Sequence, residues 1–97
     1  EVTWWGGQFA SAATPVDAEA VTRVRAAHES VTGATPAVYG GPYGSDLRLL
    51  LGLGAIPTVQ YGPGDAAAAH APDEWIDLDD VTVGAQVLTR LILDVCG

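Results

Sequence analysis

The sequence contains no methionine and no lysine, and it has a single cysteine in 97 residues. The absence of methionine, with glutamate at position 1, predicts that translation did not begin at this residue. The single cysteine, Cys96, excludes a disulfide within the chain and is typical of a reducing, cytoplasmic compartment. We interpret Cys96 as a packing residue of the last helix rather than a catalytic thiol, because no histidine adjoins it in the sequence.

Positive charge and long apolar runs are also scarce. The chain has four arginines and twelve acidic residues, which gives a formal net charge of −8. Because the arginines form no patch, the sequence argues against binding to nucleic acids or anionic membranes. No run approaches the roughly 20 apolar residues of a membrane-spanning helix, and no signal peptide is recognisable. The hydrophobic content of 48% predicts a globular chain, either one small domain or a piece of a larger one.

Hydrophobic periodicity predicts strands and helices in alternation. Strands are expected over residues 2–10, 36–41 and 57–61, and helices over residues 17–32, over 46–53 and after Asp77. Such alternation is typical of an α/β fold with parallel strands and right-handed crossovers. The adjacent Trp4 and Trp5 would point to opposite faces of the first strand, so both are buried only if both faces are covered.

Each predicted helix carries local signals. Gly33 is expected to end the first helix, in which His28 is interpreted as a solvated surface histidine. The second helix is apolar almost all round and is therefore expected to be buried, with Ser45 as its cap. Asp77 is expected to cap the last helix. Two apolar stripes at helical spacing are the expected core: Val21, Val24, Ala27 and Val31, then Val81, Ala85, Leu88, Leu91, Ile92 and Val95.

Two loops carry the candidate chemistry. The third predicted strand runs into Gly62-Pro63-Gly64, and His70 follows shortly afterwards, in a position typical of ligand-binding loops in α/β proteins. A histidine there is a metal ligand, an acid/base group or simply a surface residue. Gly44 and Ser45 begin a helix, where free N–H groups bind anions or merely form a cap. Parallel strands would place both loops on one rim of the sheet.

Three motifs in order carry a resemblance to a known family. They are Gly44-Ser45-Asp46, Gly62-Pro63-Gly64 and Ala69-His70-Ala71-Pro72-Asp73-Glu74. Together they resemble the carboxy-terminal segment of a superfamily of zinc-dependent metallopeptidases. That superfamily includes acetylornithine deacetylase, succinyl-diaminopimelate desuccinylase, aminoacylase and glutamate carboxypeptidase. The resemblance covers nearly the whole chain.

The resemblance implies a fold and a site. Residues 15–97 would form the carboxy-terminal part of a catalytic domain, a segment of a three-layer α/β sandwich with parallel strands. Residues 1–14 would be the last strand of a lid domain that often mediates homodimer formation. His70 would be a zinc ligand, while Gly44 and Ser45 would lie near the substrate carboxylate. The complete active site would hold two zinc ions, with cobalt or manganese as substitutes.

The resemblance also implies a function for the whole protein. It would be a zinc metallohydrolase, a peptidase or deacylase acting on N-acyl amino acids or dipeptides. The other metal ligands and the catalytic base of this superfamily are absent from the chain, so no catalytic residue is assigned and the isolated chain is expected to be inactive. Its partners would be the upstream segments of its own catalytic domain. The alternatives are a non-catalytic assembly module and a small-anion-binding α/β module.

Overall fold

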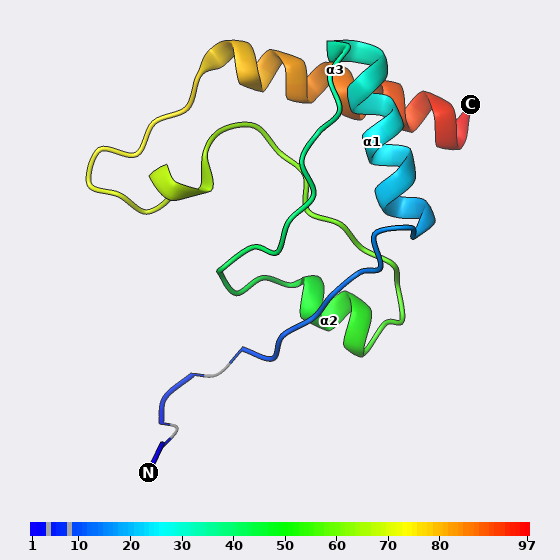
Figure 1. Ribbon diagram of the computed structural model, residues 1–97. Helices are drawn as coiled ribbons and strands as arrows, with labels where there is room; N and C mark the ends of the chain where they lie inside the picture. The colour runs from blue at the N-terminus through cyan, green and yellow to red at the C-terminus, as the bar shows by residue number, and fades with distance from the viewer. Residues whose placement is uncertain (4, 8) are drawn as a thin grey trace.

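The computed structural model describes residues 1–3, 5–7 and 9–97. Within these residues the regular structure is helical and comprises α1 (Glu19–Thr32), α2 (Leu47–Gly52), the short 3-10 helix η1 (Ala66–Ala68) and α3 (Leu78–Cys96) (Figure 1). The three α-helices agree with the sequence prediction to within a few residues at each end. Trp4, one of the predicted tryptophan pair, lies outside the described residues. No helix in the described part of the chain has the length and apolar character to cross a bilayer.

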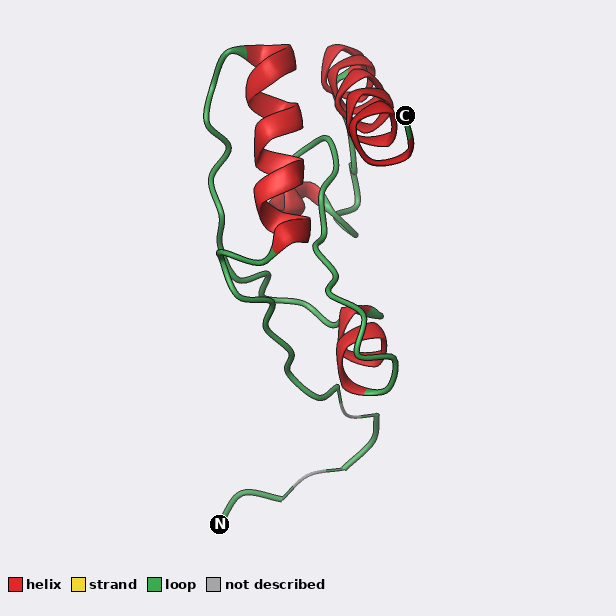
Figure 2. Cartoon of the chain, turned by 90° about the vertical axis from the view of Figure 1, so that its right-hand side faces the viewer, coloured by secondary structure: helices red, strands yellow, loops and turns green. Residues whose placement is uncertain are grey.

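The core lies between α1 and α3, which pack against each other (Figure 2). Val21, Val24 and Ala27 of α1 are buried, as the sequence predicts. On α3 the predicted stripe is wrong, because Gly84 and Val87 are buried instead. Four residues predicted for that stripe are exposed instead, namely Val81, Leu88, Ile92 and Val95. The buried face centres on Gly84 because a glycine lets neighbouring chain approach the helix backbone closely.

Capping groups set the ends of the helices. Gly33 adopts a left-handed backbone with φ 72°, and its N–H donates to the carbonyl of Glu29 at the end of α1. At the start of α3 the carboxylate of Asp77 accepts a hydrogen bond of 2.8 Å from the N–H of Asp79. Both caps are confirmed predictions, and each satisfies backbone groups that a helix end leaves without partners.

The predicted strands do not pair in the described residues. Segments 36–41 and 57–61 carry no strand assignment there, nor do the described positions of segment 2–10. A strand requires a neighbouring strand about 4.8 Å away to pair its backbone groups. One side-chain contact joins two loop segments, since the hydroxyl of Thr14 donates to the carbonyl of Thr58. The parallel α/β sandwich therefore stays a prediction.

The molecule is extended for its length. Its radius of gyration is 15.6 Å, against about 13 Å for a compact domain of 100 residues. Its accessible surface of 7549 Å² exceeds the roughly 5,200 Å² expected for a folded monomer of this mass. Helix α2 lies apart from α1 and α3 (Figures 1 and 2) and has no buried residue, so its predicted burial is wrong. Much apolar surface thus remains uncovered.

Candidate functional site

The loop before α3 is built from short local turns. Gly64 adopts a left-handed backbone with φ 88°. Asp65 then starts η1, because its carboxylate accepts a hydrogen bond of 2.8 Å from the N–H of Ala67. After η1 the N–H of Ala71 donates to the carbonyl of Ala68 at 3.3 Å. The small side chains of this segment leave the His70 side chain exposed in the loop.

His70 itself has an unusual backbone. Its φ is 63°, which places it in the left-handed region, where a residue other than glycine is uncommon. Histidine tolerates this region better than most residues, but the conformation still costs of order 1–3 kcal/mol. Such positions cluster at binding and catalytic sites, because the strain persists where function requires a fixed side-chain direction. The exposed imidazole is therefore a sound candidate ligand.

The described residues do not complete a metal site. Among them, no group of three or more histidine, cysteine, aspartate or glutamate side chains could hold a metal ion together. A catalytic zinc takes three protein ligands in addition to water or substrate. The imidazole of His70 has the right donor chemistry for one of those positions. The described residues thus offer one ligand for a metal centre, but they do not form the complete centre.

Gly44 and Ser45 lie at the start of α2. The hydroxyl of Ser45 accepts a hydrogen bond of 3.3 Å from the N–H of Leu47, so it supports the first turn as predicted. The helix begins at Leu47 with Asp46 in the cap position, one residue after the expected cap. Because α2 has only six residues, its dipole is small, and any anion binding would depend on individual hydrogen-bond donors.

The amino-terminal segment covers this turn. A Cβ atom built on Gly44 would lie 2.7 Å from Cδ1 of Phe9, which is closer than real Cβ contacts. The guanidinium of Arg48 lies 4.6 Å from the centre of the same ring, in a cation–π contact. The roles of Phe9 and Arg48 at this turn were not predicted from the sequence. An arginine within an otherwise apolar helix is a signal that could have indicated one of them.

The predicted site residues are not joined to one another. Gly44 and Ser45 belong to the start of α2 and His70 to the loop before α3 (Figure 1), and no hydrogen bond or ion pair links the two sites within the described chain. Their predicted position on one rim requires the parallel sheet, so it stays a prediction.

His28 is the clearest correction at the level of single side chains. It was expected to be solvated, yet it is partly buried and its Nδ1 lies 2.8 Å from the hydroxyl of Tyr61. The two rings meet edge to face, with centroids 5.9 Å apart and an interplanar angle of 76°. Burial raises the pKa of Tyr61 above its ordinary value, because it disfavours the charged phenolate. Because His28 and Tyr61 belong to distant segments, no local sequence signal predicts their contact.

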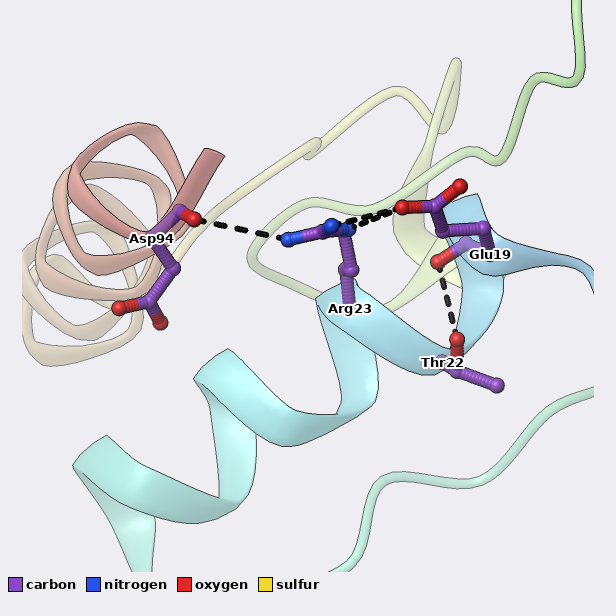
Figure 3. A network of polar contacts seen from close by, with 4 residues as sticks. All are labelled: Glu19, Thr22, Arg23 and Asp94. Carbon is purple, nitrogen blue, oxygen red and sulfur yellow. Dashed lines mark hydrogen bonds and ion pairs between the residues drawn. The ribbon is translucent and has the colours of Figure 1, made fainter. Parts of the chain in front are cut away.

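A second polar network ties α1 to the end of α3 (Figure 3). Arg23 forms an ion pair of 2.7 Å with Glu19 one turn earlier. The same guanidinium donates to the carbonyl of Asp94 at 3.5 Å, where α3 leaves carbonyls without helical partners. Such a contact also suits the negative end of the helix dipole. It lies on the helix pair rather than in either candidate loop.

An apolar groove runs beside this network. Its volume is about 660 Å³ and its lining includes the extended segment 57–59, Val24 of α1, and Leu91 and Ile92 of α3. Cys96 also lines the groove and is exposed, so its predicted role as a packing residue is wrong for the described chain. Neither His70 nor the Gly44 turn contributes to the groove.

The curated proteins that match this chain include two whose names state an activity. The chain is 39% identical over 64 residues to LysW-lysine hydrolase of Deinococcus radiodurans, covering 62% of this chain and 18% of that protein. It is 36% identical over 64 residues to a Mycobacterium tuberculosis protein named "Putative succinyl-diaminopimelate desuccinylase DapE", covering 66% of this chain and 17% of that protein. The chain therefore spans less than a fifth of the length of these curated relatives. No solved structure matches it.

The family comparison covers almost the whole chain. The model of "Peptidase family M20/M25/M40" matches residues 1–94, and this family is generally metal-dependent. The relatives are hydrolases by name, which agrees with the family. The match confirms the resemblance that the three motifs carry, and the chain belongs to peptidase family M20/M25/M40.

Proposed function

We propose that this chain is the carboxy-terminal part of a zinc-dependent hydrolase that cleaves the amide bond of N-acyl amino acids or dipeptides. The printed names of the relatives support this, because one describes hydrolysis of LysW-lysine and the other removal of succinyl from succinyl-diaminopimelate. In this proposal His70 is a metal ligand, and Gly44 and Ser45 contribute to the pocket for the substrate carboxylate.

The observation that carries the proposal is the conformation of His70. An exposed imidazole on a left-handed backbone, in a chain of a generally metal-dependent family, is what a preset ligand requires. When bound, two zinc ions would polarise the scissile carbonyl and lower the pKa of water, and cobalt or manganese could replace them. His70 would supply one neutral imidazole nitrogen to that centre. The other ligands and the general base would come from upstream segments of the protein, so the isolated chain would not catalyse hydrolysis.

The proposal also explains the uncovered surface. Residues 15–97 would complete a parallel sheet together with upstream segments of the same catalytic domain, and residues 1–14 would end a lid that forms a homodimer. The surface excess of about 2,300 Å² over a compact monomer supports a covering partner. Trp5 is 90% exposed in the lid segment, and the apolar groove runs along the extended segment 57–59. The exposed thiol of Cys96 suits a reducing cytoplasm.

Replacement of His70 tests the proposal in the complete protein. His70→Gly removes the imidazole and at the same time relieves the left-handed backbone, so loss of the site would not come from a misfolded loop. We expect the variant to bind less zinc per protein and to lose more than about a hundredfold in turnover. The measurements are metal content after dialysis and hydrolysis of succinyl-diaminopimelate and of dipeptides at saturating zinc.

Ala55→Gly is the matched control. Ala55 is the other described residue besides His70 that combines a side chain with a positive φ, at 48°. This substitution relieves backbone strain without removing a donor atom, so metal content and turnover should stay at the parental level. Full metal content and parental turnover in folded His70→Gly would show that His70 is not a ligand. A complete protein with no zinc-dependent hydrolysis would favour the non-catalytic assembly module instead.

A further inference from the structure

The hydrogen bond between His28 and Tyr61 connects α1 to the loop that leads to His70. It joins residues 33 positions apart, with Nδ1 and the hydroxyl oxygen 2.8 Å from each other. Several hydroxyl groups of α1 bond locally instead, as Thr22 does to Glu19 and Thr32 to His28. The His28–Tyr61 contact is thus one of the few polar links between a helix and a distant loop segment in the described chain.

Tyr61 immediately precedes the Gly62-Pro63-Gly64 turn. The ring of Pro63 packs on α3, where a Cβ built on Gly84 would lie 3.5 Å from Pro63 Cδ. The turn is therefore held on α1 through Tyr61 and on α3 through Pro63. Because α1 and α3 pack against each other, both anchors belong to one packed helix pair. The loop carrying His70 leaves the turn from this fixed point.

We propose that His28 and Tyr61 are positioning residues, whose hydrogen bond fixes the Gly62-Pro63-Gly64 turn and thereby the approach of the His70 imidazole to metal. This inference rests on the proposed function in one respect, namely that His70 is a ligand. Neither His28 nor Tyr61 would touch metal or substrate. They act through the backbone of the segment between Tyr61 and His70.

The chemistry of the pair suits a permanent anchor. A neutral imidazole carries one donor and one acceptor nitrogen, and a phenol hydroxyl both donates and accepts. Whichever tautomer His28 adopts, one partner can donate and the other accept, so the bond does not depend on a single proton position. The edge-to-face packing of the two rings holds their orientation in addition.

Variants that separate the hydrogen bond from the packing test the inference in the complete protein. Tyr61→Phe removes the hydroxyl and keeps the ring, while His28→Phe removes the ring nitrogens and keeps much of the volume. His28→Asn keeps a polar group near the position of Nδ1, so it should restore the bond. Tyr39→Phe is the matched control, because Tyr39 is 74% exposed.

Two readouts are needed. The first is zinc affinity, titrated in competition with a chromophoric chelator on protein freed of metal. We expect Tyr61→Phe and His28→Phe to weaken it about two- to tenfold, the range for loss of one hydrogen bond, and His28→Asn and Tyr39→Phe to stay near the parental value. The second is hydrogen–deuterium exchange of segment 57–64, which should become several-fold faster in the two weakened variants only.

The outcomes separate this inference from the proposed function. Parental zinc affinity in folded Tyr61→Phe overturns the positioning role, whatever the exchange shows. If His70→Gly keeps its full metal content, the proposed function fails, and exchange of segment 57–64 alone decides whether His28 and Tyr61 anchor the turn. Unchanged exchange in both Tyr61→Phe and His28→Phe would then overturn the anchor as well. If His28→Phe does not fold, Tyr61→Phe still decides, because it removes a single oxygen atom.

Discussion

Pro63 lies directly against Gly84, at the point where the loop segment meets α3. A Cβ built on Gly84 would be 3.5 Å from Pro63 Cδ and 3.7 Å from its Cβ and Cγ. These are ordinary van der Waals distances, so the glycine leaves room for one methyl group and no more. This contact is the α3 anchor of the turn, and it also sets which face of α3 is buried.

Gly84→Ala should therefore stabilise the protein. An alanine in the interior of a helix is favoured over glycine by about 0.5–1 kcal/mol, and its methyl group would meet Pro63 without a clash. Gly84→Leu should do the opposite and lower the free energy of unfolding by about 1–3 kcal/mol, because its bulk must displace the Pro63 ring. Urea unfolding followed by circular dichroism measures both. A stabilising Gly84→Leu would show that the two segments do not pack as described.

The cap of α3 gives a second prediction. Asp77→Ala removes the acceptor of the 2.8 Å hydrogen bond from the Asp79 N–H and should cost about 0.5–2 kcal/mol of unfolding free energy. Asp77→Asn keeps an acceptor oxygen and serves as the control. It should lower the free energy of unfolding by roughly a few tenths of a kcal/mol at most. Equal losses in the two variants would mean that the charge at Asp77 matters, and not its capping hydrogen bond.

Much of the helical structure could be predicted, because the signals act within one turn. Gly33 and Asp77 end and begin their helices through bonds to residues no more than four positions away. The face of α3 could not be predicted. That helix is apolar most of the way round, so several stripes fit its periodicity equally well. The buried face includes Gly84, which lies against Pro63, and no periodicity reveals that contact.

The candidate site shows the same difference between local signals and long-range contacts. The motifs around Gly44 and His70 led to the correct family, because they are short and ordered along the chain. The pair of His28 and Tyr61 was missed because its partners belong to distant segments. The predicted strands have no pairing partner within the described chain, and strand pairing depends on residues that the periodicity of a single segment does not specify. Local chemistry could thus be predicted where long-range contacts could not.

The contact between Phe9 and Gly44 gives a third prediction. Gly44→Ala would place a methyl group 2.7 Å from the Phe9 ring, which must then move. Since Phe9 is 64% exposed, the ring can swing outward and lose its cation–π contact with Arg48, at a cost of about 0.5–1 kcal/mol. In Phe9→Ala the same substitution should cost nothing further. A double-mutant cycle by urea unfolding measures the coupling, and zero coupling would contradict the packing of the amino-terminal segment on this turn.

The partly buried hydroxyl of Tyr61 gives a prediction about alkaline stability. Its pKa is raised above the ordinary 10.0 because burial disfavours the phenolate. As pH rises above about 10, the unfolded chain loses this proton first, so the folded state then binds more protons than the unfolded state. The contribution of Tyr61 to the free energy of unfolding is therefore fully present below about pH 10. It is lost as the pH rises through the pKa that Tyr61 has in the folded state. The free energy of unfolding should fall across this window.

Tyr61→Phe isolates that contribution, because phenylalanine has no proton to lose. Between about pH 9 and about pH 11, urea unfolding should show a smaller loss of stability for Tyr61→Phe than for the parent. At the lower pH the variant should be less stable than the parent, because it lacks the hydrogen bond to His28. Tyr39→Phe, at an exposed position, should lose as much stability as the parent over the same interval. If all three proteins lost the same amount, the Tyr61 hydroxyl would not be buried against α1, and the anchor of the Gly62-Pro63-Gly64 turn would lose its physical basis.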